Sequence, residues 1–138
     1  MTAYLLDTHY WIWLQLGDAS QIKSDARDEL LAIQRKRTLF LSAISILEIA
    51  RLSSDGLLDL SMSVDQFVEV AIRSGGLQLL PLTTRILIES MRLPGTIHRD
   101  PADRLLVATA REHGLTLVTR DKALNKYAEQ GHLNAYKL

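Results

Sequence analysis

Residues 98–121, HRDPADRLLVATAREHGLTLVTRD, carry the pattern that decides the fold of this 138-residue chain. Asp100 before Pro101 predicts the start of a helix, because Asp accepts bonds from free N–H groups and Pro fits the first helical position. Gly114 predicts the end of this helix, since glycine readily adopts the left-handed conformation found there. The run from Leu115 to Thr119 then predicts a strand, which is followed at once by a basic and an acidic residue.

The rest of the chain alternates between strand-like and helix-like segments. Ser63 and Gln66 form a capping-box pattern at the start of one helix, and Gly75-Gly76 predicts its end. This alternation requires crossover connections, so we expect an α/β fold with a mostly parallel sheet of four to five strands and helices on both faces. The expected strands are residues 4–6, 38–41, 77–82, 115–119 and 135–138, and the expected helices are residues 24–37, 44–53, 64–74, 84–93, 101–113 and 122–130.

Composition narrows the classes of protein that fit. The chain is 47% hydrophobic and 23% charged and has no internal repeat or linker, so we expect one domain over residues 1–138. It has no cysteine, which excludes a disulfide framework, a zinc finger and a cysteine nucleophile. Sixteen basic and sixteen acidic residues give no net charge, so any nucleic-acid binding must use a local basic patch.

No segment of the sequence is typical of a membrane or secretory protein. No apolar run reaches the roughly 18–20 residues that span a bilayer. The chain also lacks the charged start and small-residue cleavage site of a signal peptide. We therefore expect a soluble cytoplasmic protein with no membrane partner.

Acidic residues recur where strands end and helices begin. Asp7 directly follows the first strand, and Asp121 follows residues 115–119. Parallel strands end at one edge of a sheet, where α/β proteins bind their ligands. Glu48 lies on the helix after the second strand, and Asp100 and Asp103 begin the helix that leads into the fourth. If the first, second and fourth strands are neighbours, these carboxylates converge on one cleft.

Each acid also has a purely structural explanation. Asp7 fits a turn or a helix cap, and Asp121 fits a loop. Asp100 before a proline is better explained as an N-cap than as a functional acid. Asp103 lies in the first helical turn, where the helix dipole favours a carboxylate. Taken separately these acids are weak signals, and only their shared sheet edge favours a common function.

Glu48 leaves two explanations equally open. With Ser45 it completes a capping-box pattern, yet its neighbours are almost all apolar. A buried acid is costly unless it is paired or bound to a metal. Clustered carboxylates suit Mg²⁺ or Mn²⁺ and the metal-assisted hydrolysis of phosphodiesters. Without metal, two carboxylates ~5–6 Å apart repel by roughly 3 kcal/mol at an effective dielectric near 20.

Four segments, in this order, resemble the motifs of the PIN domain, a small α/β nuclease fold. They are YLLDT at residues 4–8, SAISILEI at 42–49, DPADRLLVATA at 100–110 and LTLVTRD at 115–121. The resemblance covers nearly the whole chain. In length and compactness the chain is similar to the VapC-type toxins of bacterial toxin–antitoxin pairs, which are ribonucleases.

The resemblance implies a site and a set of partners. It makes Asp7, Glu48, Asp103 and Asp121 the catalytic acids that bind Mg²⁺ or Mn²⁺, with Asp100, Thr8 and Thr119 as accessory residues. It implies a first strand between the second and fourth, and hydrolysis of RNA that leaves a 5′-phosphate and a 3′-hydroxyl. It also implies a homodimer, and a VapB-like antitoxin that covers the cleft and places a basic side chain among the acids.

Basic residues flank the proposed acids, and the candidates for contacts to substrate phosphates are Arg99, Arg104, Arg120 and Lys122, with His98 beside them. Pairing of Arg104 and Arg120 with nearby carboxylates, or a solvated position, is equally compatible with the sequence. We interpret the single His9 as structural. Of Trp11 and Trp13, at least one is expected in the core, and an exposed one would form a partner surface.

Three alternatives remain open from the sequence. The chain can be a PIN-type nuclease outside a toxin pair, or a non-catalytic PIN-like binding module, which the complete set of acids disfavours. A receiver-like or phosphatase-like domain would use Asp7 as phosphoryl acceptor. However, His9 stands where haloacid-dehalogenase enzymes need a second Asp, and the paired acids of a receiver are absent.

Overall fold

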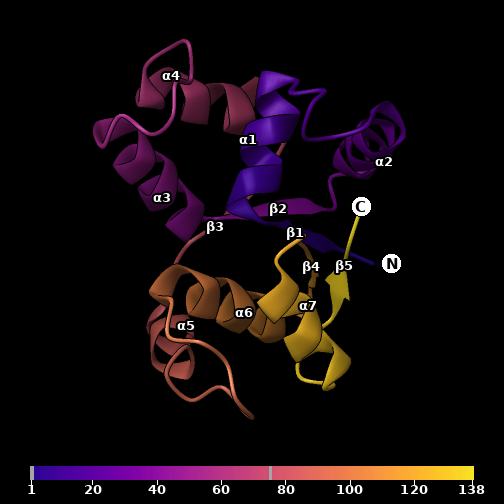
Figure 1. Cartoon of the computed structure of the whole chain (residues 1–138), viewed down its shortest axis with the longest axis vertical. Coiled ribbons are helices and arrows are strands. Elements are labelled where there is room, and N and C mark those ends of the chain that lie inside the picture. Colours follow the sequence, from indigo (N-terminus) through magenta and orange to yellow (C-terminus); the bar gives the residue numbers. More distant parts are fainter. Residues whose placement is uncertain (1, 75) are drawn as a thin grey trace.

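The computed structural model describes residues 2–74 and 76–138, which form a five-stranded sheet between two layers of helices (Figure 1). The strand order is β3-β2-β1-β4-β5, and every adjacent pair is parallel. The strands are β1 (Tyr4–Leu6), β2 (Leu39–Ser42), β3 (Gln78–Leu80), β4 (Thr116–Val118) and β5 (Ala135–Tyr136). The predicted α/β class is therefore confirmed, and β1 lies between β2 and β4 as the resemblance implied.

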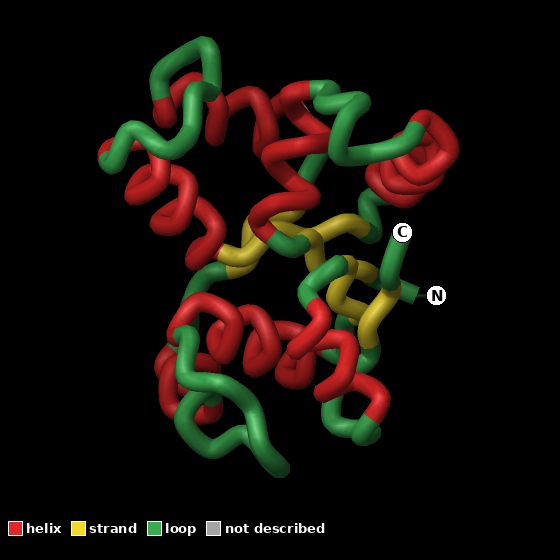
Figure 2. Tube along the Cα trace, viewed as in Figure 1, coloured by secondary structure: helices red, strands yellow, loops and turns green. Residues whose placement is uncertain are grey.

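Helices cover both faces of the sheet. Figure 2 shows the strands as a thin central layer, with the N-terminal helices on one side and the C-terminal helices on the other. The first group is α1 (Thr8–Leu16), α2 (Ser24–Arg35), α3 (Ala43–Ser54) and α4 (Val64–Glu69), which continues into a π-helical turn, Val70–Ser74. The second group is α5 (Thr84–Glu89), α6 (Pro101–His113) and α7 (Lys122–Glu129). Among the described helices none is long and apolar enough to cross a membrane.

The two faces of the sheet carry two separate hydrophobic cores. Successive strand residues point to opposite faces, so Leu5 packs under α6 and α7 while Leu6 packs under α1. Leu117 and Val118 of β4 divide in the same way. Because both faces are buried, the strands read as continuous apolar runs, which is why they were recognisable in the sequence.

Helix α1 is the element that the sequence analysis missed. Its nine residues, THYWIWLQL, are apolar on nearly every side, so they show no amphipathic period. The helix is largely buried between the sheet and its neighbours, which is typical of such a sequence. Its ends do carry signals: Asp7 caps the N-terminus, and Gly17 adopts a left-handed φ of 67° at the C-terminus.

Other boundaries moved by a few residues, and one interpretation of a cap was wrong. Ser63 and Gln66 form the predicted capping box, with bonds of 3.1 and 3.3 Å. Ser45 and Glu48 do not, because α3 already begins at Ala43 with Ser42 as its N-cap. The helical segment that starts at Val64 ends with the π-helical turn at Ser74, as predicted, and Gly75, one of the two glycines predicted to end it, lies outside the described residues. Helix α5 ends four residues earlier than the predicted residue 93, at Glu89.

Trp11 should be among the largest single contributors to stability. It is fully buried, its ring lies 5.3 Å from that of Phe67, and its Nε1 donates to Gln15. Trp11→Ala should lower the free energy of unfolding by about 3–5 kcal/mol, measured by urea denaturation. Leu57→Ala is the control, since Leu57 is 71% exposed and its loss should matter little. Equal effects of the two changes would contradict the assignment of the core.

Candidate active site

Three of the predicted acids are N-cap residues of helices, and each accepts a hydrogen bond from a free backbone N–H group. Asp7 caps α1 and accepts from His9 at 3.4 Å, and Asp121 caps α7 and accepts from Leu124 at 3.0 Å. Asp100 caps α6 and accepts from Asp103 at 3.1 Å, as predicted. A helix N-terminus favours negative charge, so these caps hold the carboxylates in place.

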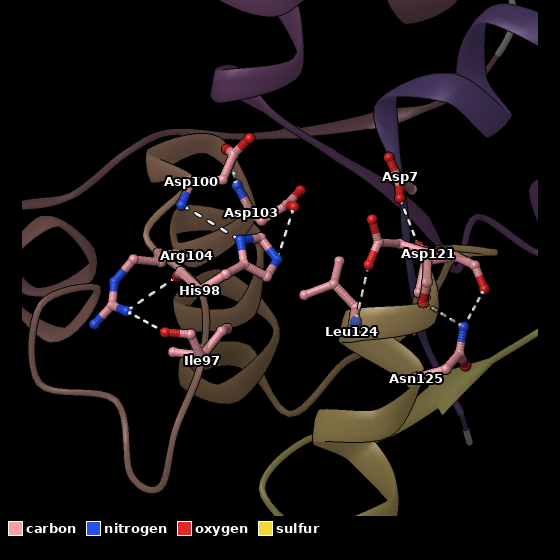
Figure 3. Close-up of polar contacts among 10 residues, drawn as sticks. Asp7, Ile97, His98, Asp100, Asp103, Arg104, Asp121, Leu124 and Asn125 are labelled. Carbon is pink, nitrogen blue, oxygen red and sulfur yellow. Dashed lines mark hydrogen bonds and ion pairs between the residues drawn. The ribbon is translucent and has the colours of Figure 1, made fainter.

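The turn between β4 and α7 connects two of these acids (Figure 3). The hydroxyl of Thr119, fully buried, donates to Asp7 Oδ2 at 2.6 Å and accepts from the backbone N–H of Asp121 at 3.1 Å. The Asn125 amide donates to the carbonyl oxygens of both Thr119 and Asp121 at 3.0 Å and closes the turn. Thr119 therefore fixes the separation between the ends of β1 and β4.

Glu48 of α3 is held in the site by a second buried hydroxyl group, that of Thr8. Thr8 Oγ1 donates to Glu48 Oε1 at 2.6 Å and lies 2.7 Å from Ser45 Oγ. Thr8 has one proton, which goes to the carboxylate, so Ser45 must be the donor in the second contact. Ser45 contacts this site, whereas the sequence analysis considered it only as part of a possible capping box with Glu48. Its position one helical turn before Glu48 is the signal that relates them.

His98 and Asp103 form the other side of the site. His98 Nε2 lies 3.2 Å from Asp103 Oδ2, and His98 Nδ1 accepts from the backbone N–H of Asp100 at 3.3 Å. His98, Asp103 and Asp121 each offer one possible ligand atom, and these atoms lie within 4.8 Å of one another. The sequence analysis had placed His98 only among the flanking basic residues.

Burial and mutual repulsion raise the pKa values of three carboxyl groups of the site, those of Asp7, Glu48 and Asp103. Burial first, and then repulsion from Asp100, Asp7, Asp121 and Glu48, raises the pKa of Asp103 from 3.8 to about 7. Burial also raises the pKa values of Asp7 and Glu48, and the bonds from Thr119 and Thr8 oppose this effect. A divalent cation would relieve this repulsion. The donors are carboxylate oxygens with one imidazole beside them, a set that fits a divalent metal.

The four basic candidates divide into two kinds. Arg104 donates to three backbone carbonyls, those of Ser90 at 2.9 Å and of Ile97 and His98 at 3.3 Å. Arg120 donates to the Gln21 carbonyl and lies over aromatic rings of α1. Within residues 2–74 and 76–138 neither arginine forms an ion pair with a carboxylate, so that interpretation was wrong. The other two candidates, Arg99 and Lys122, are exposed.

The positions of the aromatic residues of α1 confirm only part of the prediction. Trp11 belongs to the core, as expected for at least one tryptophan. Trp13 is half-buried beneath Arg120 and therefore is not a freely exposed partner surface. His9 is exposed, and its ring lies 5.8 Å from that of Trp13.

Comparison with known proteins agrees with this architecture. Residues 4–130 match the family model of the PIN domain, and the chain belongs to this family. Within it, the chain is 31% identical to ribonuclease VapC22 of Mycobacterium tuberculosis over 92% of this chain and 93% of that protein.

Solved structures show the same fold at lower identity. One is VapBC2 from Rickettsia felis bound to a promoter DNA fragment, with a TM-score of 0.70, 17% identity and 99% coverage of both chains. Another is FitAcB from Neisseria gonorrhoeae, with a TM-score of 0.59, 23% identity and 96% coverage of both chains.

The raised pKa of Asp103 gives stability a defined pH dependence. Between about pH 4 and pH 7 the folded protein keeps a proton on Asp103 that the unfolded chain releases, so the free energy of unfolding falls as pH rises. Asp103→Asn removes this effect. In metal-free buffer it should stabilise the protein increasingly from about pH 5 to about pH 8, measured by urea denaturation. A stabilisation of the same size at every pH would contradict the assigned pKa.

Proposed function

We propose that this chain is a metal-dependent endoribonuclease of the VapC type, with Mg²⁺ or Mn²⁺ as cofactor. The observation that supports the proposal most strongly is the convergence of Asp7, Asp103 and Asp121 near the ends of β1 and β4. Glu48 lies beside them and accepts a hydrogen bond from Thr8. The 31% identity to a ribonuclease over most of the chain supports the same activity. The whole chain, residues 1–138, acts as one nuclease domain.

The residues take distinct roles in this proposal. Asp7, Glu48, Asp103 and Asp121 hold the cation, and Thr8 and Thr119 orient two of these carboxylates through their hydroxyl groups. A bound divalent cation lowers the pKa of a water molecule and neutralises charge on the attacked phosphate. Hydrolysis then leaves a 5′-phosphate and a 3′-hydroxyl and does not use the ribose 2′-hydroxyl.

Two of the basic candidates remain available for RNA. Arg99 and Lys122 are exposed and stand directly before Asp100 and after Asp121, so they can contact phosphates beside the acids. Arg104 and Arg120 use their guanidinium groups within the domain. The zero net charge of the chain agrees with a local contact of this kind rather than with binding over a broad basic surface.

We further propose that the chain is the toxin of a toxin–antitoxin pair in the cytoplasm and forms a homodimer. Its similarity to VapC22, and the likeness of its fold to VapBC2 from Rickettsia felis, support this partner class. A VapB-like antitoxin would inhibit the enzyme by covering the acids and placing a basic side chain among them. The cation and such a side chain would relieve the same carboxylate repulsion.

Metal should stabilise the folded protein. Mg²⁺ or Mn²⁺ at about a hundred times its dissociation constant contributes about 2.7 kcal/mol from one site. Thermal unfolding should therefore shift upward with metal, and Asp7→Asn should lose most of this shift. A melting temperature indifferent to both metals, together with intact RNA, would count against the proposed nuclease.

Variants of Asp100 and Asp103 should distinguish a helix cap from a metal ligand. Asp100→Asn should keep both stability and most of the cleavage, because Asn caps a helix nearly as well as Asp. Asp100→Ala should cost ~1 kcal/mol of stability. Asp103→Asn should abolish metal-dependent cleavage of a labelled RNA. If Asp100→Asn removes cleavage as fully as Asp103→Asn does, Asp100 belongs to the metal ligands.

Expression without an antitoxin should arrest growth, and the acids should be required for it. Asp7→Asn or Asp121→Asn should relieve the arrest, since each removes a proposed metal ligand. Growth curves after induction, with equal protein amounts verified by immunoblot, measure this. Equal toxicity of the wild type and both variants would indicate a mechanism other than cleavage.

A further inference from the structure

We propose that Arg120 is a positioning residue of the acid cluster. Its contacts hold the turn that contains Thr119 and Asp121 against α1, and Asp7 is the N-cap of α1. This role differs from the phosphate contact considered for Arg120 from the sequence, and it rests on the proposed metal-dependent function.

The guanidinium of Arg120 lies against α1 and the loop after it. Its central carbon lies 4.1 Å from the ring centroid of Trp13 and 5.2 Å from that of Tyr10. These rings are three residues apart and share one face of the helix. A terminal nitrogen donates to the Gln21 carbonyl, and Nε is buried without a hydrogen-bond acceptor among the described residues. The cation is therefore used for stacking on α1.

The neighbours of Arg120 in sequence make the contacts that define the site. Thr119 donates to Asp7 and accepts from Asp121, so a shift of this turn disturbs both bonds. Asp121 also begins α7, and its free carboxylate oxygen depends on where that helix starts. By fixing the turn against the helix that starts at Asp7, Arg120 holds the carboxylates of Asp7 and Asp121 at a set separation.

Arginine suits this role and lysine does not. A planar guanidinium can stack on an aromatic ring and donate to a carbonyl at the same time, whereas an ammonium is a compact, strongly hydrated charge. A phosphate contact has the opposite requirement, because lysine binds phosphate well as a point charge. Arg120→Lys therefore separates the two roles.

The test measures metal and RNA binding separately, on the full chain. Isothermal titration with Mn²⁺ gives the metal affinity, and fluorescence anisotropy in EDTA gives the affinity for a labelled RNA. Arg120→Lys should weaken Mn²⁺ binding about 10–100-fold, as loss of an outer partner of metal ligands typically does. Its RNA affinity in EDTA should stay within about twofold of the wild type, because the positive charge remains.

Two further variants control for general loss of stability. Arg111→Lys is the first control, because Arg111 also donates to a backbone carbonyl, that of His132. This contact involves none of the acids, so the variant should bind Mn²⁺ like the wild type. Trp13→Leu leaves Arg120 in place but removes its stacking partner, and it should weaken Mn²⁺ binding as Arg120→Lys does. The double variant should lose less Mn²⁺ affinity than the sum of the two single losses, because both changes break the contact between Arg120 and Trp13. If Arg120→Lys fails to fold, Trp13→Leu carries the test alone.

The possible outcomes are distinct. Wild-type Mn²⁺ affinity in both Arg120→Lys and Trp13→Leu overturns the positioning role. Unchanged affinity of Arg120→Lys for both Mn²⁺ and RNA is the result expected of a phosphate contact, which lysine can replace, and it overturns the positioning role. Additive effects of the two changes show that Arg120 does not act through Trp13 and also overturn the proposal. A wild-type protein that binds no Mn²⁺ overturns both this inference and the proposed function, whereas the other failures leave the proposed function standing.

Discussion

Repulsion among partly buried carboxylates is the constraint on which the arrangement of this site depends. The fold brings Asp7 and Asp121 together because β1 and β4 are adjacent and parallel, and Glu48 joins them from the helix that follows β2. Burial raises the cost of ionising Asp7, Glu48 and Asp103, repulsion between carboxylates adds to this cost, and Asp103, whose pKa reaches about 7, shows the combined effect most strongly. The surrounding hydroxyls and backbone N–H groups counter this cost only in part, and a cation is the natural complement.

The sequence analysis treated helix capping and metal binding as alternative roles for the acids, but the structure is compatible with both roles for one side chain. A carboxylate has two oxygens, and a cap uses one of them. Asp7 gives Oδ1 to the N-terminus of α1 and Oδ2 to Thr119, while Asp121 gives only Oδ1 to α7. The cap orients the side chain and removes its rotational freedom before any ligand arrives. A helix start is thus a suitable place for a metal-binding acid, as proposed for Asp7 and Asp121, whereas at α6 the cap is Asp100 and the proposed ligand is Asp103 in the first turn.

The sequence was sufficient for the strands and for the acids that follow them because both depend on local patterns, whereas the strand order was implied by the resemblance to the PIN domain. Continuous apolar strands, the helix start at Asp100 and the helix end at Gly114 are encoded within a few residues. The contacts of Ser45 and Arg120 depend instead on residues from distant segments, such as Thr8, 37 positions before Ser45. Helix α1 escaped notice for a third reason: burial on nearly every side removes the periodicity that identifies a helix.

The division between acids and basic residues also bears on how the proposed enzyme would meet RNA. The chain has no net charge, so no general attraction compensates for the carboxylates at the site. A phosphodiester approaching Asp7, Asp103 and Asp121 meets charges of its own sign until a cation is present. Arg104 and Arg120 do not offset this repulsion by pairing with the acids, because their guanidinium groups are engaged with carbonyls and aromatic rings. In the proposed function, Asp7, Asp103 and Asp121 would hold a cation that would offset this repulsion and would supply an activated water for the attack.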